Sequence, residues 1–214
     1  MTIALAEPEA RALEAFCRRQ LRWDSRLSAR VVTTPTALGV FTAPPLGVLA
    51  FVAVPRTGSE EVLDAIVNLA DLADMLVRGR VNIDELPRAT VVPGPAPTLT
   101  HLPPSDGWQV PMQAVAGDLI TPVDAATIEF QARAAGRSPA EQEDIAEEIW
   151  RRPAFGGLPL RALHAARQLG MLTNDMAKVT AATSGQWKRL STVRGQVFSY
   201  ATGPAARLAL RIVH

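Results

Sequence analysis

Residues 29–55 read ARVVTTPTALGVFTAPPLGVLAFVAVP, and this stretch decides the fold of the first part of the chain. It contains three short runs of β-branched, aromatic and aliphatic residues, separated by Gly39 and by Pro44 and Pro45. Runs of this length that are bounded by turn residues are typical of β-strands. We therefore expect a three-stranded antiparallel meander.

A helix is expected on each side of this meander. Residues 7–23 bring Leu13, Phe16 and Cys17 to one face at helical spacing. After Gly58, Ser59 is a candidate N-cap, an apolar stripe runs from Val62 to Val77, and Gly79 is a candidate C-cap. The expected N-terminal unit, about residues 1–90, therefore packs two helices on three strands.

A proline-rich stretch follows this unit. Residues 87–111 contain seven prolines, so regular structure is not expected across most of it. We interpret residues 91–111 as a linker. The alternative is a partly ordered surface segment, because Leu99 and Trp108 could dock on a core.

The rest of the chain, residues 112–214, predicts a helical unit with a small antiparallel sheet. Helix starts are expected at Thr121-Pro122 and at Ser138-Pro139, where Ser138 and Glu141 have capping-box spacing. A further helix is predicted over 158–169. Short strands are predicted at 178–182, 187–191 and 196–201, while the tail from Ala205 fits either a helix or a strand. The fold class is α+β.

The charges are spread unevenly over a chain whose net charge is +1. Residues 150–214 hold ten basic residues and one acidic residue, whereas residues 1–149 hold twelve basic and twenty acidic residues. Such asymmetry suggests an anionic partner, or one part of the chain docking on the other.

Several classes of protein are disfavoured by composition. No apolar run approaches the roughly 20 residues of a membrane span, and the first residues lack the pattern of a secretory signal. The single cysteine, Cys17, cannot form an internal disulfide or a zinc site of several cysteines. We expect a cytoplasmic protein with no cofactor, no metal and no membrane partner.

One segment suggests DNA binding. Ala166, Gly170 and Met176 have the spacing of the small residue, turn glycine and core residue of a helix-turn-helix. Over residues 138–201 the chain resembles winged-helix DNA-binding domains. That resemblance implies base or phosphate contacts from Thr173, Asn174 and Lys178, and phosphate contacts from a wing that carries Lys188, Arg189 and Arg194. A second register makes residues 159–170 the recognition helix, with Arg161 and Arg167 exposed on it.

Three functions remain open. The leading hypothesis is a non-enzymatic binding or adaptor protein whose basic C-terminal unit contacts an anionic partner, either an acidic protein surface or the chain itself. The second is a DNA-binding regulator, and the third is an enzyme of unrecognised type. The candidate contact residues are Arg161, Arg167, Thr173, Asn174, Lys178, Lys188, Arg189 and Arg194.

Catalytic and pocket residues are harder to identify. No nucleophile, phosphate-loop or dinucleotide motif is found, and Cys17 on an apolar helix face is expected to be a buried thiol. An enzyme would need a deep pocket joining residues such as His101, Asp106 and His164. Phe41 and Phe51 could line a small-molecule pocket, and a homodimer is a further expectation.

Overall fold

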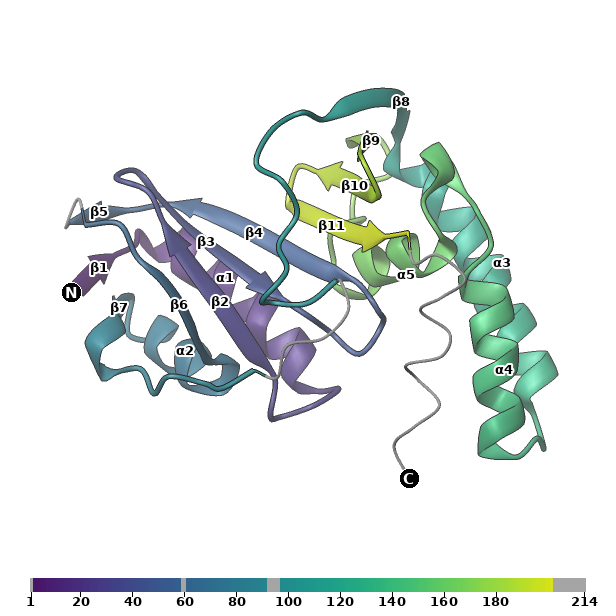
Figure 1. Ribbon diagram of the computed structural model, residues 1–214, viewed down its shortest axis with the longest axis horizontal. Coiled ribbons are helices and arrows are strands. Elements are labelled where there is room, and N and C mark those ends of the chain that lie inside the picture. Colours follow the sequence, from purple (N-terminus) through teal and green to yellow (C-terminus); the bar gives the residue numbers. More distant parts are fainter. Residues whose placement is uncertain (1, 59–60, 92–96, 202–214) are drawn as a thin grey trace. The chain divides into compact units, whose positions relative to one another are not determined.

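The computed structural model describes residues 2–58, 61–91 and 97–201, and the chain divides into two compact units, Met1–Leu102 and Pro103–His214. The boundary between the units lies within the proline-rich stretch. Each unit packs helices against an antiparallel sheet, so the predicted α+β class is confirmed (Figure 1).

The main sheet of the first unit confirms the predicted meander and adds a fourth strand. Strands β2 (Ser28–Thr33), β3 (Ala37–Thr42) and β4 (Leu49–Pro55) pair in sequence order, and β6 (Asp64–Asn68) pairs with the free edge of β2. Phe41 lies opposite Phe51, with ring centroids 4.3 Å apart. These two rings therefore stack on each other.

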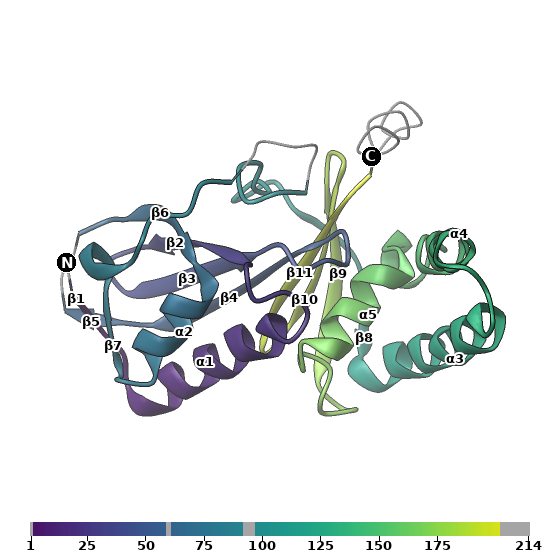
Figure 2. The same ribbon diagram turned by 90° about the horizontal axis from the view of Figure 1, so that it is seen from below.

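Helices α1 (Glu7–Leu21) and α2 (Leu69–Leu76) cover one face of this sheet (Figure 2). Leu13, Phe16 and Cys17 of α1 are buried, as their spacing predicted. Strands β5 (Thr57–Gly58), β1 (Thr2–Ala4) and β7 (Arg80–Asn82) form a second small sheet, and a short 3-10 helix follows at Ile83–Glu85. Arg30 donates to the carbonyl of Leu99 at 2.9 Å, so the segment around Leu99 lies on this unit.

The predicted second helix was wrong in its first half. Residues 64–68 form strand β6, because Ala65 and Val67 alternate inward and pair with β2. The helix begins only at Leu69, where the Asn68 side chain accepts from the N–H groups of Ala70 and Asp71 at 2.8 and 3.4 Å. Val62, expected in the apolar stripe, is 71% exposed. The predicted cap Ser59 lies outside the described residues.

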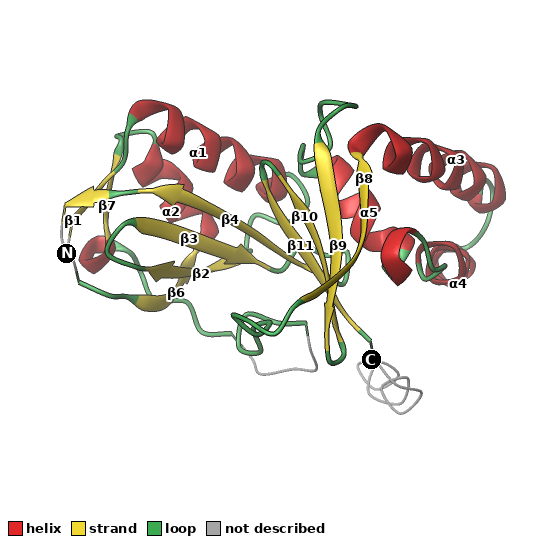
Figure 3. Cartoon of the chain, turned by 90° about the horizontal axis from the view of Figure 1, so that it is seen from above, coloured by secondary structure: helices red, strands yellow, loops and turns green. Residues whose placement is uncertain are grey.

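The second unit has four antiparallel strands in the order β11-β10-β9-β8 (Figure 3). They are β8 (Gln109–Val115), β9 (Lys178–Ser184), β10 (Trp187–Thr192) and β11 (Gly195–Tyr200). The last three were predicted. Strand β8 was missed because it lies at the end of the proline-rich stretch.

Helices α3 (Ala116–Ala134), α4 (Pro139–Trp150) and α5 (Leu160–Gln168) lie on one side of this sheet, with a 3-10 turn at Phe155–Gly157 (Figure 3). Successive side chains of a strand point to opposite faces. Ala181, Leu190 and Val197 are buried and lie opposite one another across the sheet, so they mark the face that the helices cover. Arg189 therefore points to the other face.

The predicted start of α3 was wrong, whereas that of α4 is confirmed. Pro122 lies inside α3, which begins at Ala116 directly after β8. At α4 the Ser138 N–H donates to Glu141 at 2.9 Å, and the Glu141 N–H donates to the Ser138 hydroxyl at 3.4 Å. This is the capping box that the sequence predicted.

The first helix-turn-helix register was also wrong. Residues 173–177 form a turn, in which the Asn174 side chain accepts from the N–H of Met176 at 3.0 Å. An asparagine that binds its own backbone in this way favours a turn over a helix. Met176, the expected core residue, is 76% exposed, and Lys178 begins β9 opposite Val115. The tail from Ala205 lies outside the described residues.

Candidate binding surface

The charges of the second unit are divided between its layers. Helices α3, α4 and α5 carry eight acidic and three basic residues, whereas strands β8 to β11 carry three basic residues and no acidic one. The whole unit holds twelve basic and ten acidic residues. The basic C-terminal unit expected from the sequence is therefore a basic sheet beside an acidic helical layer.

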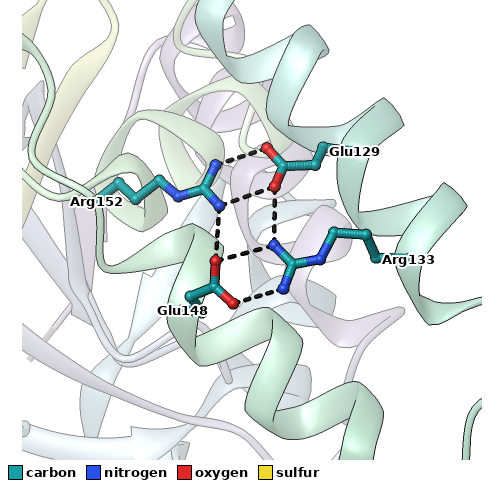
Figure 4. A network of polar contacts seen from close by, with 4 residues as sticks. All are labelled: Glu129, Arg133, Glu148 and Arg152. Atoms are coloured by element: carbon teal, nitrogen blue, oxygen red, sulfur yellow. Dashed lines mark hydrogen bonds and ion pairs between the residues drawn. The ribbon is translucent and has the colours of Figure 1, made fainter.

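Ion pairs neutralise much of the helical layer (Figure 4). Arg152 binds Glu129 at 2.6 Å, Arg133 binds Glu148 at 2.5 Å, and further contacts close the four side chains into one network. Hydrogen bonds from Arg152 hold the pKa of Glu129 at about 2, and those from Arg133 do the same for the pKa of Glu148. This network joins α3 to α4 and to Arg152, the second residue after α4.

The α5 residues of the alternative recognition helix are also engaged within the unit. Arg161 lies 2.5 Å from Glu147 of α4, and Arg167 lies 3.6 Å from Asp124 of α3. Between them, His164 stacks on Trp150 with ring centroids 4.3 Å apart, and burial lowers the pKa of His164. These contacts hold α5 against the other two helices.

Four other predicted residues lie at one end of the sheet. Thr173 and Asn174 form the turn before β9, Lys178 begins β9, and Arg194 lies in the turn between β10 and β11. Thr180 pairs with Ser191, so the same register continued places Lys178 opposite residue 193, next to Arg194. This end of the sheet is exposed and carries the cations of Lys178 and Arg194, with one acid, Asp175, in the turn before β9.

Lys188 and Arg189 are neighbours on β10, but their side chains point to opposite faces of the sheet. Lys188 points to the helical side and donates to the carbonyl of Gly157. On the other face, the Arg189 guanidinium carbon lies 4.3 Å from the ring centroid of Trp108, a cation–π arrangement. The Trp108 ring also packs on Phe198 at 5.9 Å.

Arg189 differs from the helical arginines in having no acid beside it. Its cross-strand neighbours are Ala182 and Phe198, both buried. Its Nε atom is buried without an acceptor, and burial lowers its pKa. Across the described ranges, its guanidinium makes no ion pair and no hydrogen bond.

The sequence analysis did not select Trp108 as a contact residue. It lies in the proline-rich stretch, and only its ability to dock on a core was expected. Its indole N–H donates to the carbonyl of Pro104 at 3.0 Å, which orients the ring. We define the sheet-face surface as Trp108, Lys178, Arg189 and Arg194.

Outside the sheet-face surface, the second unit also has a surface depression. The tips of α3 and α4 enclose an open depression of about 450 Å³, lined by small and by oppositely charged residues including Arg133, Arg137, Glu141 and Asp144. Among the residues that the structure describes, no group of three or more His, Cys, Asp or Glu could hold a metal ion. None of the helices described has the length and apolar character to span a membrane.

The two units match two sequence families. Residues 1–100 match a domain of unknown function, DUF8010, and residues 103–204 match another, DUF8185. No curated protein matches the sequence significantly.

Solved structures show a similar fold. A DNA polymerase sliding clamp from Caulobacter crescentus has a TM-score of 0.58 at 11% identity, over 100% of this chain and 69% of the clamp chain. A sliding clamp from Pseudomonas aeruginosa has a TM-score of 0.54 at 10% identity, over 97% and 67%. The DNA polymerase III beta subunit from Thermotoga maritima has a TM-score of 0.52 at 10% identity, over 100% and 68%. At this identity the similarity shows the fold alone, and it is compatible with a non-enzymatic binding protein.

Proposed function

We propose that this chain is a non-enzymatic binding protein with a sliding-clamp-like fold, and that the sheet of its second unit contacts an acidic partner protein. The observation that carries the proposal is the absence of acidic residues from β8 to β11. Six arginines of this unit have carboxylate partners: Arg133, Arg137, Arg151, Arg152, Arg161 and Arg167. Within the described part of the chain, Lys178, Arg189 and Arg194 have none.

The distribution of charge favours a protein over a nucleic acid. Non-specific binding to duplex DNA depends on many Lys and Arg contacts to phosphates. Here only a few cations lie on the sheet, and the helices beside them carry five more acidic than basic residues. An acidic protein surface needs only a few complementary charges, which steer and orient the contact. Duplex DNA remains the second candidate, because the similar structures are DNA polymerase sliding clamps.

A charge-reversal experiment on the full chain tests the proposal. Binding of fluorescent polyglutamate is measured by anisotropy for the wild type and for the double variant K178E/R194E. We expect the double variant to bind about tenfold more weakly, because two attractive contacts become repulsive.

The matched control is Arg137→Glu, which reverses an exposed charge near the tip of the helical hairpin. It should leave the affinity within about twofold, since small changes at a distant exposed site are additive and weak. The control changes the net charge by half as much as the double variant, so a loss of binding free energy about half as large would show that only net charge matters. Failure of the wild type to bind polyglutamate at low salt would refute the proposal.

The same samples are tested with mixed-sequence duplex DNA. Tighter binding of DNA than of polyglutamate, lost in K178E/R194E, would replace the acidic protein with nucleic acid as the partner. Reversal of Lys188 is a poorer test of either partner, because Lys188 binds the Gly157 carbonyl and its loss would disturb the fold.

A further inference from the structure

Arg189 and Trp108 make the most defined feature of the sheet-face surface. The guanidinium carbon stacks 4.3 Å from the Trp108 ring centroid, and the indole N–H is fixed to Pro104 at 3.0 Å. A stacked guanidinium keeps its plane parallel to the ring, which leaves its N–H edge free for a planar acceptor. The stack therefore orients Arg189 without using its donors.

The surroundings of Arg189 make these donors strong. Ala182 and Phe198, directly opposite on the neighbouring strands, are 1% and 3% exposed. A hydrogen bond to a charged group gains strength where water is excluded, and a buried donor without a partner is costly. The Nε–H of Arg189 is buried without an acceptor, so the Nη groups are the donors open to a partner.

We propose that Arg189 and Trp108 form a subsite for the carboxylate of an Asp or Glu side chain on the partner, bound by the two Nη groups at the outer edge of Arg189. The inference rests on the proposed function and adds the group that is recognised. A carboxylate offers two oxygens in one plane, which match the two donors on one edge of a guanidinium.

This chain does not supply the carboxylate from the elements next to Arg189. Strands β9, β10 and β11 contain no Asp or Glu, and residues 201–214 contain Arg207 and Arg211 but no acid. Asp106 lies two residues before Trp108, but Arg189 makes no ion pair with it in the part of the chain that the structure describes. A second molecule is therefore the expected source. Lys178 and Arg194 on the same sheet favour a partner segment with more than one acidic residue.

The test follows the guanidinium N–H signals of Arg189 by NMR in the full-length chain. The signals are assigned by their loss in Arg189→Lys, and the chain is titrated with a capped decapeptide of alternating glutamate and serine. The control peptide has glutamine in place of glutamate. We expect a saturable downfield shift of the Arg189 signal with the glutamate peptide and no shift with the glutamine peptide.

Affinities of two matched variants complete the test. Arg189→Lys keeps the positive charge but replaces the planar guanidinium and its paired N–H donors with an ammonium group. The affinity for the glutamate peptide should fall about tenfold or more. Arg137→Lys makes the same exchange at an exposed arginine outside the sheet-face surface, and should stay within about twofold. Circular dichroism and thermal melting confirm that each variant folds, and Trp108→Leu should weaken binding in the same direction as Arg189→Lys.

The outcomes separate the inference from the proposed function. The subsite is refuted if the glutamate peptide binds while the chemical shift of Arg189 does not change and Arg189→Lys keeps full affinity. The basic sheet would then remain a binding surface. If neither peptide binds, the proposed function fails as well. If inorganic phosphate shifts the signal at lower concentration than acetate, the preference for a carboxylate is refuted.

Discussion

At Gly156 the backbone of the second unit passes so close to β9 that no side chain fits. A Cβ placed there would lie 2.2 Å from the Cβ of Ala181, which is buried. The residue also has a φ of +60°, which disfavours any residue with a Cβ. Packing and backbone conformation therefore both require glycine at this position.

Gly156→Ala should therefore lower the free energy of unfolding by about 3 kcal/mol, because overpacking and a left-handed backbone both oppose it. Urea denaturation of the full chain measures the change. Gly136→Ala is the matched control, since it has a similar φ of +71° but no atom within 4 Å of the added Cβ. It should cost only about 1 kcal/mol. Equal losses would show that the contact with Ala181 relaxes freely.

At the scale of elements, the network of Glu129, Arg133, Glu148 and Arg152 fixes how α3 and α4 pair. Its side chains remain between 35% and 55% exposed. Exposed pairs are individually weak and are screened by salt, but a closed network of bidentate contacts orders two helices together. The acidic cluster on α4 is visible in the sequence. The arginines that form ion pairs with it, Arg133 and Arg152, come from α3 and from the segment that follows α4.

The network gives a prediction on pH dependence. The pKa values of Glu129 and Glu148 are lowered from 4.5 to about 2, so their stabilisation is present above pH 4.5. It should be lost as the pH falls from 4.5 towards 2, because the unfolded chain takes up protons first. Thermal melting of the wild type and of the variant E129Q/E148Q measures this. The variant should lose less stability over that range, and parallel curves would show that other carboxylates dominate.

At the scale of the whole molecule, charge is divided by layer more than by position along the chain. The contrast between residues 1–149 and 150–214 arises because the acidic helix α4 ends at Trp150. By compact unit, the first holds ten basic and eleven acidic residues and the second twelve and ten. Neither unit has the large positive charge of a non-specific DNA-binding domain.

We therefore expect weak binding of duplex DNA with a shallow salt dependence. On B-DNA the affinity falls by about 0.9 log units per log unit of salt for each phosphate contact. Lys178, Arg189 and Arg194 offer at most three contacts on the sheet, so the slope should not exceed about 3. Anisotropy at several salt concentrations measures it. A steeper slope would show that further basic residues contact phosphates, and it would favour the DNA-binding hypothesis.

The fold was predictable where local signals suffice. The meander of β2, β3 and β4, the hairpins of β9 to β11 and the Ser138 cap all depend on residues close in sequence, through turn chemistry and capping. The second helix failed because the apolar residues of 64–68 fit both a helical stripe and an alternating strand. Pairing with β2, more than 30 residues away, decided between them.

The candidate surface shows the same division. The sequence by itself determined the α+β class, the capped start of α4 and the identities of the basic residues. Only the tertiary structure decided that Arg161 and Arg167 are neutralised by other helices, that Lys188 faces inward, and that Arg189 stacks on Trp108. The physical reason is that the free energy of a charge depends on the groups around it, and the groups around these residues are brought there by pairing and packing between distant segments.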